Sequence, residues 1–159
     1  MSMTREEVLN GLRTRFGDVI LDFHDKSAKR VYVELKPGAL VPVAGHLFRE
    51  LGARFHIASG VDNRSQLEVL YHFSVEALNL LVTLRVKLDK RAPRVDSLVP
   101  TIKGAAWIER EIHELLGIDF TGHPDQRRLL LSEEWPEGVY PLRRDYQEWD
   151  AKAIRDRGV

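Results

Sequence analysis

The sequence of 159 residues contains no cysteine, and that absence removes several kinds of chemistry. Without thiolates the chain cannot form a disulfide framework, supply cysteine ligands to an iron–sulfur cluster or a zinc ion, or use a thiol nucleophile. We therefore expect this chain to hold no cofactor of its own, and no iron–sulfur cluster in particular.

Neither sign of charge dominates, and no long hydrophobic run is present. Lys plus Arg equals Asp plus Glu at 24 each, so the composition indicates no basic surface for nucleic acid or for an anionic membrane. No segment approaches the roughly twenty apolar residues of a membrane span, and residues 1–7 are polar, unlike a signal peptide. We expect a soluble cytoplasmic chain that has no nucleic-acid partner and reaches a membrane only through partner proteins.

The motifs of common enzyme classes are also missing. The chain contains no Gly-rich dinucleotide-binding turn, no P-loop and no GxSxG nucleophile motif. Its six histidines are dispersed, and two of them, His56 and His72, fall in expected strands. Isolated strand histidines are more often packed or surface residues than catalytic ones. The sequence therefore predicts no catalytic site within this chain.

The residue pattern before position 129 predicts one α+β domain. Thr4 and Glu7 form a capping-box pattern that begins an apolar helical face, and Gly17 ends it. Alternation of apolar and polar residues predicts five strands. We expect strands at residues 19–24, 30–35, 55–61, 66–74 and 78–88, and further helices at residues 40–51 and about 101–116. This order predicts a two-layer domain at residues 1–128, with its helices on one side of the sheet.

Residues 109–130, the signature segment, are the most informative part of the chain. Ile108, Ile112, Leu115 and Leu116 recur at helical spacing, which predicts one apolar stripe on the helix at 101–116. The remaining positions of this helix are mostly charged or polar. Gly117 follows where a helix C-cap is expected, so the segment begins as a helix and continues into the turn that follows.

Three interpretations of the polar residues on this helix are compatible with the sequence. Arg110 and Glu114 can pair at i, i+4 on a solvated face. Alternatively, Glu109 and His113 can reach one metal ion together with Glu114 or His123, although no HExxH pattern is present. In the third interpretation, this cluster meets complementary charges on a partner protein and sets the register of docking.

The signature segment resembles that of the 30 kDa subunit of respiratory complex I, the NADH:quinone oxidoreductase, and of related subunits of membrane-bound hydrogenases. The matching residues are Glu109, Arg110, Glu111, Glu114, Leu115, Leu116, His123, Arg127, Leu129 and Leu130. The resemblance implies an α+β fold and a non-catalytic subunit of the peripheral arm, on the cytoplasmic face of the inner membrane. It implies two kinds of partner, a large catalytic (49 kDa-like) subunit and the iron–sulfur subunits.

Residues 129–159 show no sustained helical or strand period, which predicts an extended tail. The tail contains Trp135, Tyr140, Leu142, Tyr146 and Trp149, which cannot be buried by a segment without secondary structure of its own. They therefore pack on the domain or on another protein, and the resemblance implies the large catalytic subunit. We also expect a short polar helix at residues 150–157. The tail is shorter than the C-terminal arm of some respiratory members of the family. A short tail fits the hydrogenase-type relatives at least as well as a full NADH-oxidising complex.

Two hypotheses of different classes follow. In the first, the chain is an accessory subunit of a quinone oxidoreductase complex, or alternatively of a membrane-bound hydrogenase. Its expected partner-interface residues are Glu109, Arg110, Glu111, Glu114, His123, Arg127, Trp135, Tyr140, Arg143, Arg144 and Asp145. In the second, a stand-alone domain binds a metal ion or small ligand through Glu109, His113 and His123. Convergence of those three side chains favours the second hypothesis, and a protruding tail favours the first.

Overall fold

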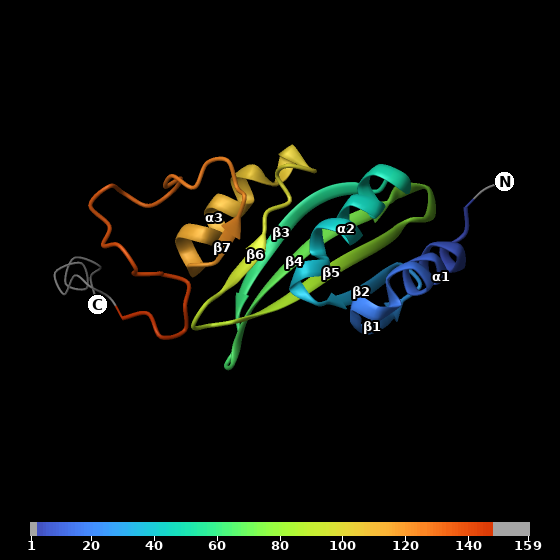
Figure 1. Ribbon diagram of the computed structural model, residues 1–159, viewed down its shortest axis with the longest axis horizontal. Helices are drawn as coiled ribbons and strands as arrows, with labels where there is room; N and C mark the ends of the chain where they lie inside the picture. Colours follow the sequence, from blue (N-terminus) through green and yellow to red (C-terminus); the bar gives the residue numbers. More distant parts are fainter. Residues whose placement is uncertain (1–2, 148–159) are drawn as a thin grey trace, which may run out of the picture.

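A five-stranded mixed sheet is the framework of the protein (Figure 1). The structure, a computed structural model, describes residues 3–147. The strands are β1 (Ile20–Ser27), β2 (Arg30–Leu35), β3 (Arg54–Asp62), β4 (Gln66–Val75) and β5 (Leu80–Asp89). Their order is β1-β2-β5-β4-β3; only β2 and β5 run parallel, and the other neighbours are antiparallel. The sheet therefore has β1 and β3 as its two edges.

The helices pack on one face of this sheet, as the sequence predicts. They are α1 (Arg5–Phe16), α2 (Leu40–Gly45), which continues as a π turn at His46–Glu50, and α3 (Ala106–Leu116). The Thr4 and Glu7 capping box begins α1 as expected. Figure 1 shows α1 and α2 in front of the sheet, and α3 near the β3 edge. In β2 and β5 every second residue is buried against this layer, because side chains alternate across a strand.

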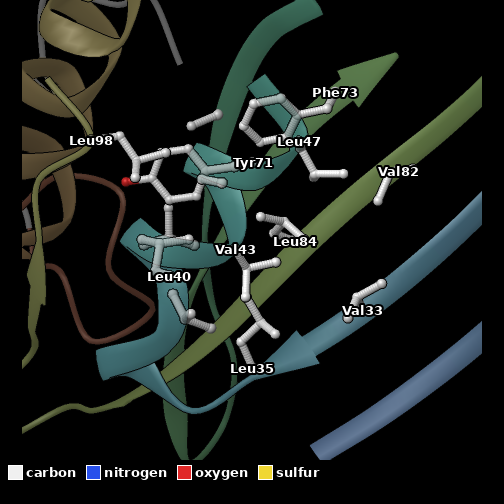
Figure 2. Close-up of a cluster of buried hydrophobic side chains, with 14 of the residues drawn as sticks. Val33, Leu35, Leu40, Val43, Leu47, Tyr71, Phe73, Val82, Leu84 and Leu98 are labelled. Carbon is white, nitrogen blue, oxygen red and sulfur yellow. The ribbon is translucent and has the colours of Figure 1, made fainter. Parts of the chain in front are cut away.

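The core lies between α2 and the middle strands. Figure 2 shows side chains of β2 and β5 meeting those of α2, with Tyr71 and Phe73 of β4 beside them. The side chains labelled there are Val33, Leu35, Leu40, Val43, Leu47, Tyr71, Phe73, Val82, Leu84 and Leu98, and none is more than marginally exposed. The opposite face of the sheet carries polar and charged groups such as Glu34 and Lys87, which form an ion pair of 2.8 Å.

Several details differ from the expectations: β1 continues to Ser27, and β5 begins at Leu80, after a 3-10 turn at Glu76–Leu78. The helix expected at residues 101–116 begins at Ala106, and a short 3-10 turn at Lys103–Ala105 precedes it, because Gly104 weakens a regular helix there. The connector after β5 contains β6 (Arg94–Asp96), which pairs in parallel with β7 (Asp119–Thr121). Strands of three residues are too short to show a period, so the sequence did not predict this second sheet.

The chain after β7 contains no helix or strand over residues 122–147, in agreement with an extended segment. Figure 1 shows this segment running around α3 and then returning to the end of the sheet. Trp149 and the helix expected at residues 150–157 lie outside the described residues. Within residues 3–147, no helix is both long and apolar enough to cross a membrane.

Candidate functional site

The apolar stripe of α3 packs on the β3 edge of the sheet, as the helical spacing predicts. Ile112 and Leu116 are buried, and both contact β3 at Gly60. A Cβ atom at Gly60 would overlap the Leu116 side chain and lie 3.0 Å from Ile112 Cγ2. The missing side chain at this position lets the helix approach the strand closely, and this contact fixes the orientation of the other α3 side chains.

Glu109 points into the protein and is 0% exposed. Its Oε1 atom accepts hydrogen bonds from the Tyr71 hydroxyl at 3.0 Å and the Leu98 N–H at 2.8 Å, and its Oε2 atom accepts one from Ser97 Oγ at 2.5 Å. Burial raises the pKa of the Glu109 carboxyl, and these hydrogen bonds oppose that change. Burial and the neighbouring Glu109 also raise the pKa of Tyr71. Glu109 therefore links α3, β4 and the segment after β6.

Arg110 binds the chain where it leaves the turn after β7. Its Nε atom donates to the Arg127 carbonyl at 2.9 Å, and its Nη2 atom donates to the Arg128 carbonyl at 2.7 Å. Asp125 lies beside it, with 3.7 Å between Arg110 Nη1 and the carboxylate. Hydrogen bonds from Arg127 hold the pKa of Asp125 well below its usual range. This charged cluster fixes the start of the extended segment.

Glu114 holds the next part of that segment, which we call the strap (residues 129–147). Its carboxylate accepts from the backbone N–H groups of Leu129 at 2.9 Å, Leu130 at 2.6 Å and Leu131 at 3.4 Å. An irregular segment has no neighbouring strand to accept these N–H groups, so a carboxylate takes that role. The Glu114 side chain is buried beneath the strap as a result.

The strap also caps the C-terminal end of α3. The Leu142 N–H donates to the Leu115 carbonyl at 3.1 Å, and Arg143 Nε donates to the Leu116 carbonyl at 2.7 Å. The last carbonyl groups of a helix have no partner within the helix and favour a nearby cation. The strap therefore supplies donors that the helix itself lacks.

Two further contacts anchor the second half of the strap. The ring of Tyr140 lies against Gly117, whose φ of 72° makes it the left-handed C-cap expected from the sequence. Asp62, at the end of β3, accepts from the Arg144 N–H at 2.8 Å and pairs with Lys90. Hydrogen bonds from Lys90 and Arg144 lower the pKa of Asp62 although its burial opposes this.

The histidines of the signature segment bind backbone carbonyl groups. His123 Nε2 lies 3.0 Å from the Ala106 carbonyl oxygen, and His113 Nδ1 lies 2.8 Å from that of Ile118. Neither ring makes a hydrogen bond with Glu109 among the described residues. No group of three or more His, Asp or Glu side chains within residues 3–147 is arranged to hold a metal ion. The geometry therefore gives the metal-site hypothesis no support.

The aromatic residues of the strap lie against their own chain. The Trp135 indole N–H donates to the Val139 carbonyl at 2.8 Å, and its ring stacks on Tyr146 at 6.1 Å between centroids. The Arg143 guanidinium lies 4.8 Å from the centre of the Tyr140 ring. These contacts lie within the strap, and its bonds to Leu115, Leu116 and Asp62 hold it against the domain, the alternative left open by the sequence. Contact of these residues with a partner stays a prediction.

An apolar groove of about 500 Å³ lies where β3, α3 and the strap meet. Its walls include Ile57 of β3, Trp107 and Ile108 of α3, and Leu130 of the strap, with Glu111 at one side. Trp107 is 73% exposed, Leu130 61% and Ile57 50%. Nothing in the sequence singles out Ile57 or Trp107, because no local pattern shows that a strand and a distant helix expose apolar groups beside each other.

Comparison with known proteins identifies the family. Residues 33–151 match the family described as the 30 kDa subunit of respiratory-chain NADH dehydrogenase. The chain belongs to that family. A subunit of the NADH-quinone oxidoreductase of Roseiflexus sp. strain RS-1 is 36% identical over 152 residues, which cover 91% of this chain and 85% of that protein.

Hydrogenase-type proteins and a solved respiratory complex are also similar. Formate hydrogenlyase subunit 5 of Escherichia coli K12 is 31% identical over 148 residues, and the match covers 91% of this chain but 26% of that protein. This chain of the 30 kDa family therefore spans about a quarter of that relative's length. A chain of the archaeal membrane-bound sulfane sulfur reductase shares the fold, with a TM-score of 0.78 at 15% identity, covering 96% of this chain and 90% of that one.

Proposed function

We propose that the protein is a non-catalytic subunit of a membrane-associated electron-transfer complex of the NADH:quinone oxidoreductase type. The observation that carries this proposal is the family match over residues 33–151, together with relatives that are named as subunits of such complexes. The structure adds support, since Glu109, Arg110 and Glu114 form hydrogen bonds with other parts of the same chain. In this role the chain supplies shape and docking surface, holds no cofactor, and leaves electron transfer to its neighbours.

The groove between β3, α3 and the strap is the surface that fits this role best. Large exposed apolar side chains grouped together are typical of protein interfaces, and tryptophan is enriched among the residues that contribute most to binding. Trp107, Leu130 and Ile57 provide these groups, while Glu111 at the side of the groove offers a charge that sets register. We assign the groove to the large catalytic subunit, with the iron–sulfur subunits as further neighbours.

The signature residues then act on docking in two ways. Arg110 and Glu114 hold the beginning of the strap, and through it they position Leu130 in the groove wall. Glu111 lies at the groove itself, and Arg144 and Asp145 are exposed on the strap. Arg110 and Glu114 therefore support the docking surface from within. Glu111, Arg144 and Asp145 are available for direct contact with a partner.

A hydrogenase-type complex is the second candidate. It is favoured by the 31% identity to formate hydrogenlyase subunit 5 over nearly the whole of this chain. Both candidates place the chain on the cytoplasmic face of the inner membrane and attach it to the membrane through partners. They differ in the electron donor and acceptor of the complex.

Purification from the native host tests the proposal. We expect the tagged protein, isolated from gently solubilised membranes, to bring down a large catalytic subunit and iron–sulfur subunits in near-equal amounts, as measured by mass spectrometry. The identity of these subunits distinguishes a quinone oxidoreductase from a hydrogenase. Recovery of the protein without such subunits would contradict the docking role.

Trp107→Asp tests the groove directly. The side chain is largely exposed, so the variant should fold normally yet lose most of its partner subunits, because a carboxylate replaces an apolar contact. Leu21→Asp is the matched control, since Leu21 is an exposed apolar residue on β1, at the opposite edge of the sheet. Equal recovery of partners with both variants would rule out the groove as the docking surface.

A further inference from the structure

A second hollow of about 600 Å³ lies across one end of the sheet, and no residue of α3 or of the strap lines it. The turn between β1 and β2 contributes Lys29, the start of β2 contributes Arg30, the start of β5 contributes Leu81, and β4 and β3 contribute Ser74 and His56. Four neighbouring strands thus build one concave surface. It shares no described residue with the apolar groove except His56.

Positive charge in this hollow is not neutralised within the described chain. Lys29 and Arg30 make no ion pair among residues 3–147. The only acidic side chain in the described lining, Glu76, forms an ion pair with Arg54 at 3.2 Å. The hollow therefore presents a guanidinium and an ammonium group whose charges lack a local counter-ion.

A β-bulge brings His56 to the same surface. The pairing register of β3 and β4 shifts between Phe55 and Ile57, and an irregularity of this kind re-aims a side chain at a sheet edge. His56 Nε2 consequently lies 2.7 Å from Ser74 Oγ in the hollow. On the adjacent β4 position, burial lowers the pKa of His72, and the charges of Arg30 and His56 lower it further. The charge of Arg30 thus acts on His72.

We propose that this hollow binds a phosphate monoester. Arg30 supplies the planar pair of donors that matches two phosphate oxygens, and Lys29 adds a point charge beside it. The His56 ring and the Ser74 hydroxyl offer further donors on the far wall, while Leu81 forms an apolar floor for the carbon part of the ligand. A free phosphate monoester and the head group of phosphatidic acid share this chemistry.

Nuclear magnetic resonance of the full chain, titrated with glycerol phosphate, tests the site. We expect saturable shifts of the His56 and His72 ring signals, with a dissociation constant in about the millimolar range. A bound dianion also offsets the field of Arg30, so the pKa of His72 should rise on saturation. Arg30→Gln should weaken binding at least tenfold. Arg64→Gln is the control, because Arg64 is exposed in the turn at the opposite end of β3 and β4.

Vesicles distinguish the two sources of phosphate. Arg30-dependent co-sedimentation with vesicles of equal parts phosphatidic acid and phosphatidylcholine would support the site and assign it to a lipid head group. Binding of glycerol phosphate without co-sedimentation would support the site and assign it to a soluble phosphate monoester. Absence of saturable shifts, or equal weakening by Arg30→Gln and Arg64→Gln, would overturn the proposal. None of these outcomes depends on the partner subunits.

Discussion

At the scale of single residues, Glu109 shows how one buried carboxylate joins separate parts of the fold. Its burial disfavours the charged form more strongly than the donors from Tyr71, Ser97 and Leu98 favour it, so its pKa lies above the usual 4.5. The folded protein therefore holds this proton more tightly than the unfolded chain does. By linkage, the contribution of Glu109 to stability falls as the pH rises from about 4.5 through the raised pKa.

We expect Glu109→Gln to remove this pH dependence. The amide cannot ionise, but its oxygen still accepts from Tyr71 and Leu98, and the Ser97 hydroxyl can reorient to accept from the amide nitrogen. Urea unfolding at a series of pH values measures the effect. The stability of the variant relative to the native chain should increase between pH 4.5 and neutrality. Two curves that run parallel over this interval would show that Glu109 does not titrate differently on folding.

Glu109→Ala provides the contrasting variant. It leaves the Tyr71 hydroxyl, the Ser97 hydroxyl and the Leu98 N–H buried without their acceptor, so the free energy of unfolding should drop by about 3 kcal/mol or more at every pH. A loss below about 1 kcal/mol would mean that water replaces the carboxylate. The two variants together separate the ionisation of Glu109 from its role as an acceptor.

At the scale of secondary-structure elements, the fit of α3 on β3 depends on Gly60. In Gly60→Ala the new Cβ atom would overlap Leu116, so α3 has to move away from the strand, at about 1–3 kcal/mol of stability. Gly11→Ala is the matched control, since nothing lies within 4 Å of the added atom on α1. That change should be neutral or stabilising, by up to about 1 kcal/mol. Thermal melts of both variants measure the difference, and equal melting temperatures would contradict the close contact.

The strap depends on Glu114 in a comparable way. Glu114→Ala removes the acceptor of three strap N–H groups, and we expect the strap to detach while α3 and the sheet stay folded. Limited proteolysis should then cut within residues 129–147 far faster than in the native chain. Glu111→Ala alters a neighbouring acidic residue that has no such hydrogen bonds among the described residues, so its cleavage rate should stay unchanged. Similar cleavage rates for the two variants would show that Glu114 does not hold the strap in place.

The sequence predicted most elements because their patterns are local. Val31, Val33 and Leu35 alternate with polar residues, and β2 has the predicted bounds. The spacing of Ile112 and Leu116 likewise gave the buried face of α3. The pairing of β6 with β7 escaped prediction because hydrogen bonds between two three-residue segments on either side of a helix leave no period in either segment.

Only part of the candidate site could be predicted, because contacts between distant segments leave no pattern in either segment. The resemblance pointed to Arg110 and Glu114 as partner contacts, which stays a prediction, and the structure shows both residues bonded to the backbone of residues 127–131. Their hydrogen bonds to the strap depend on the reversal of the chain after β7, which spacing along a helix cannot reveal. The groove needs Trp107 and Ile57 side by side, and this follows from the packing of α3 on β3 rather than from either sequence segment.

At the scale of the whole molecule, the strap connects the stability of the α+β domain with the proposed docking surface. Arg110 and Glu114 hold one end of it, and Asp62 at the end of β3 holds the other. Because these anchors belong to two different elements, the strap fixes its own path and also fastens the C-terminal end of α3 to the sheet. Loss of the strap should therefore affect both stability and assembly.

Two shortened chains separate these effects. A chain ending at residue 128 lacks the strap, whereas one ending at residue 147 retains it. We expect the shorter chain to keep its helix and strand content by circular dichroism but to lose about 1–2 kcal/mol of stability, or about 3–8 °C in melting temperature. It should also fail to co-purify with partner subunits, because Leu130 is missing from the groove. If both chains melt alike, the strap adds no stability; if the shorter one still recovers the partners, the docking surface lies on the domain alone.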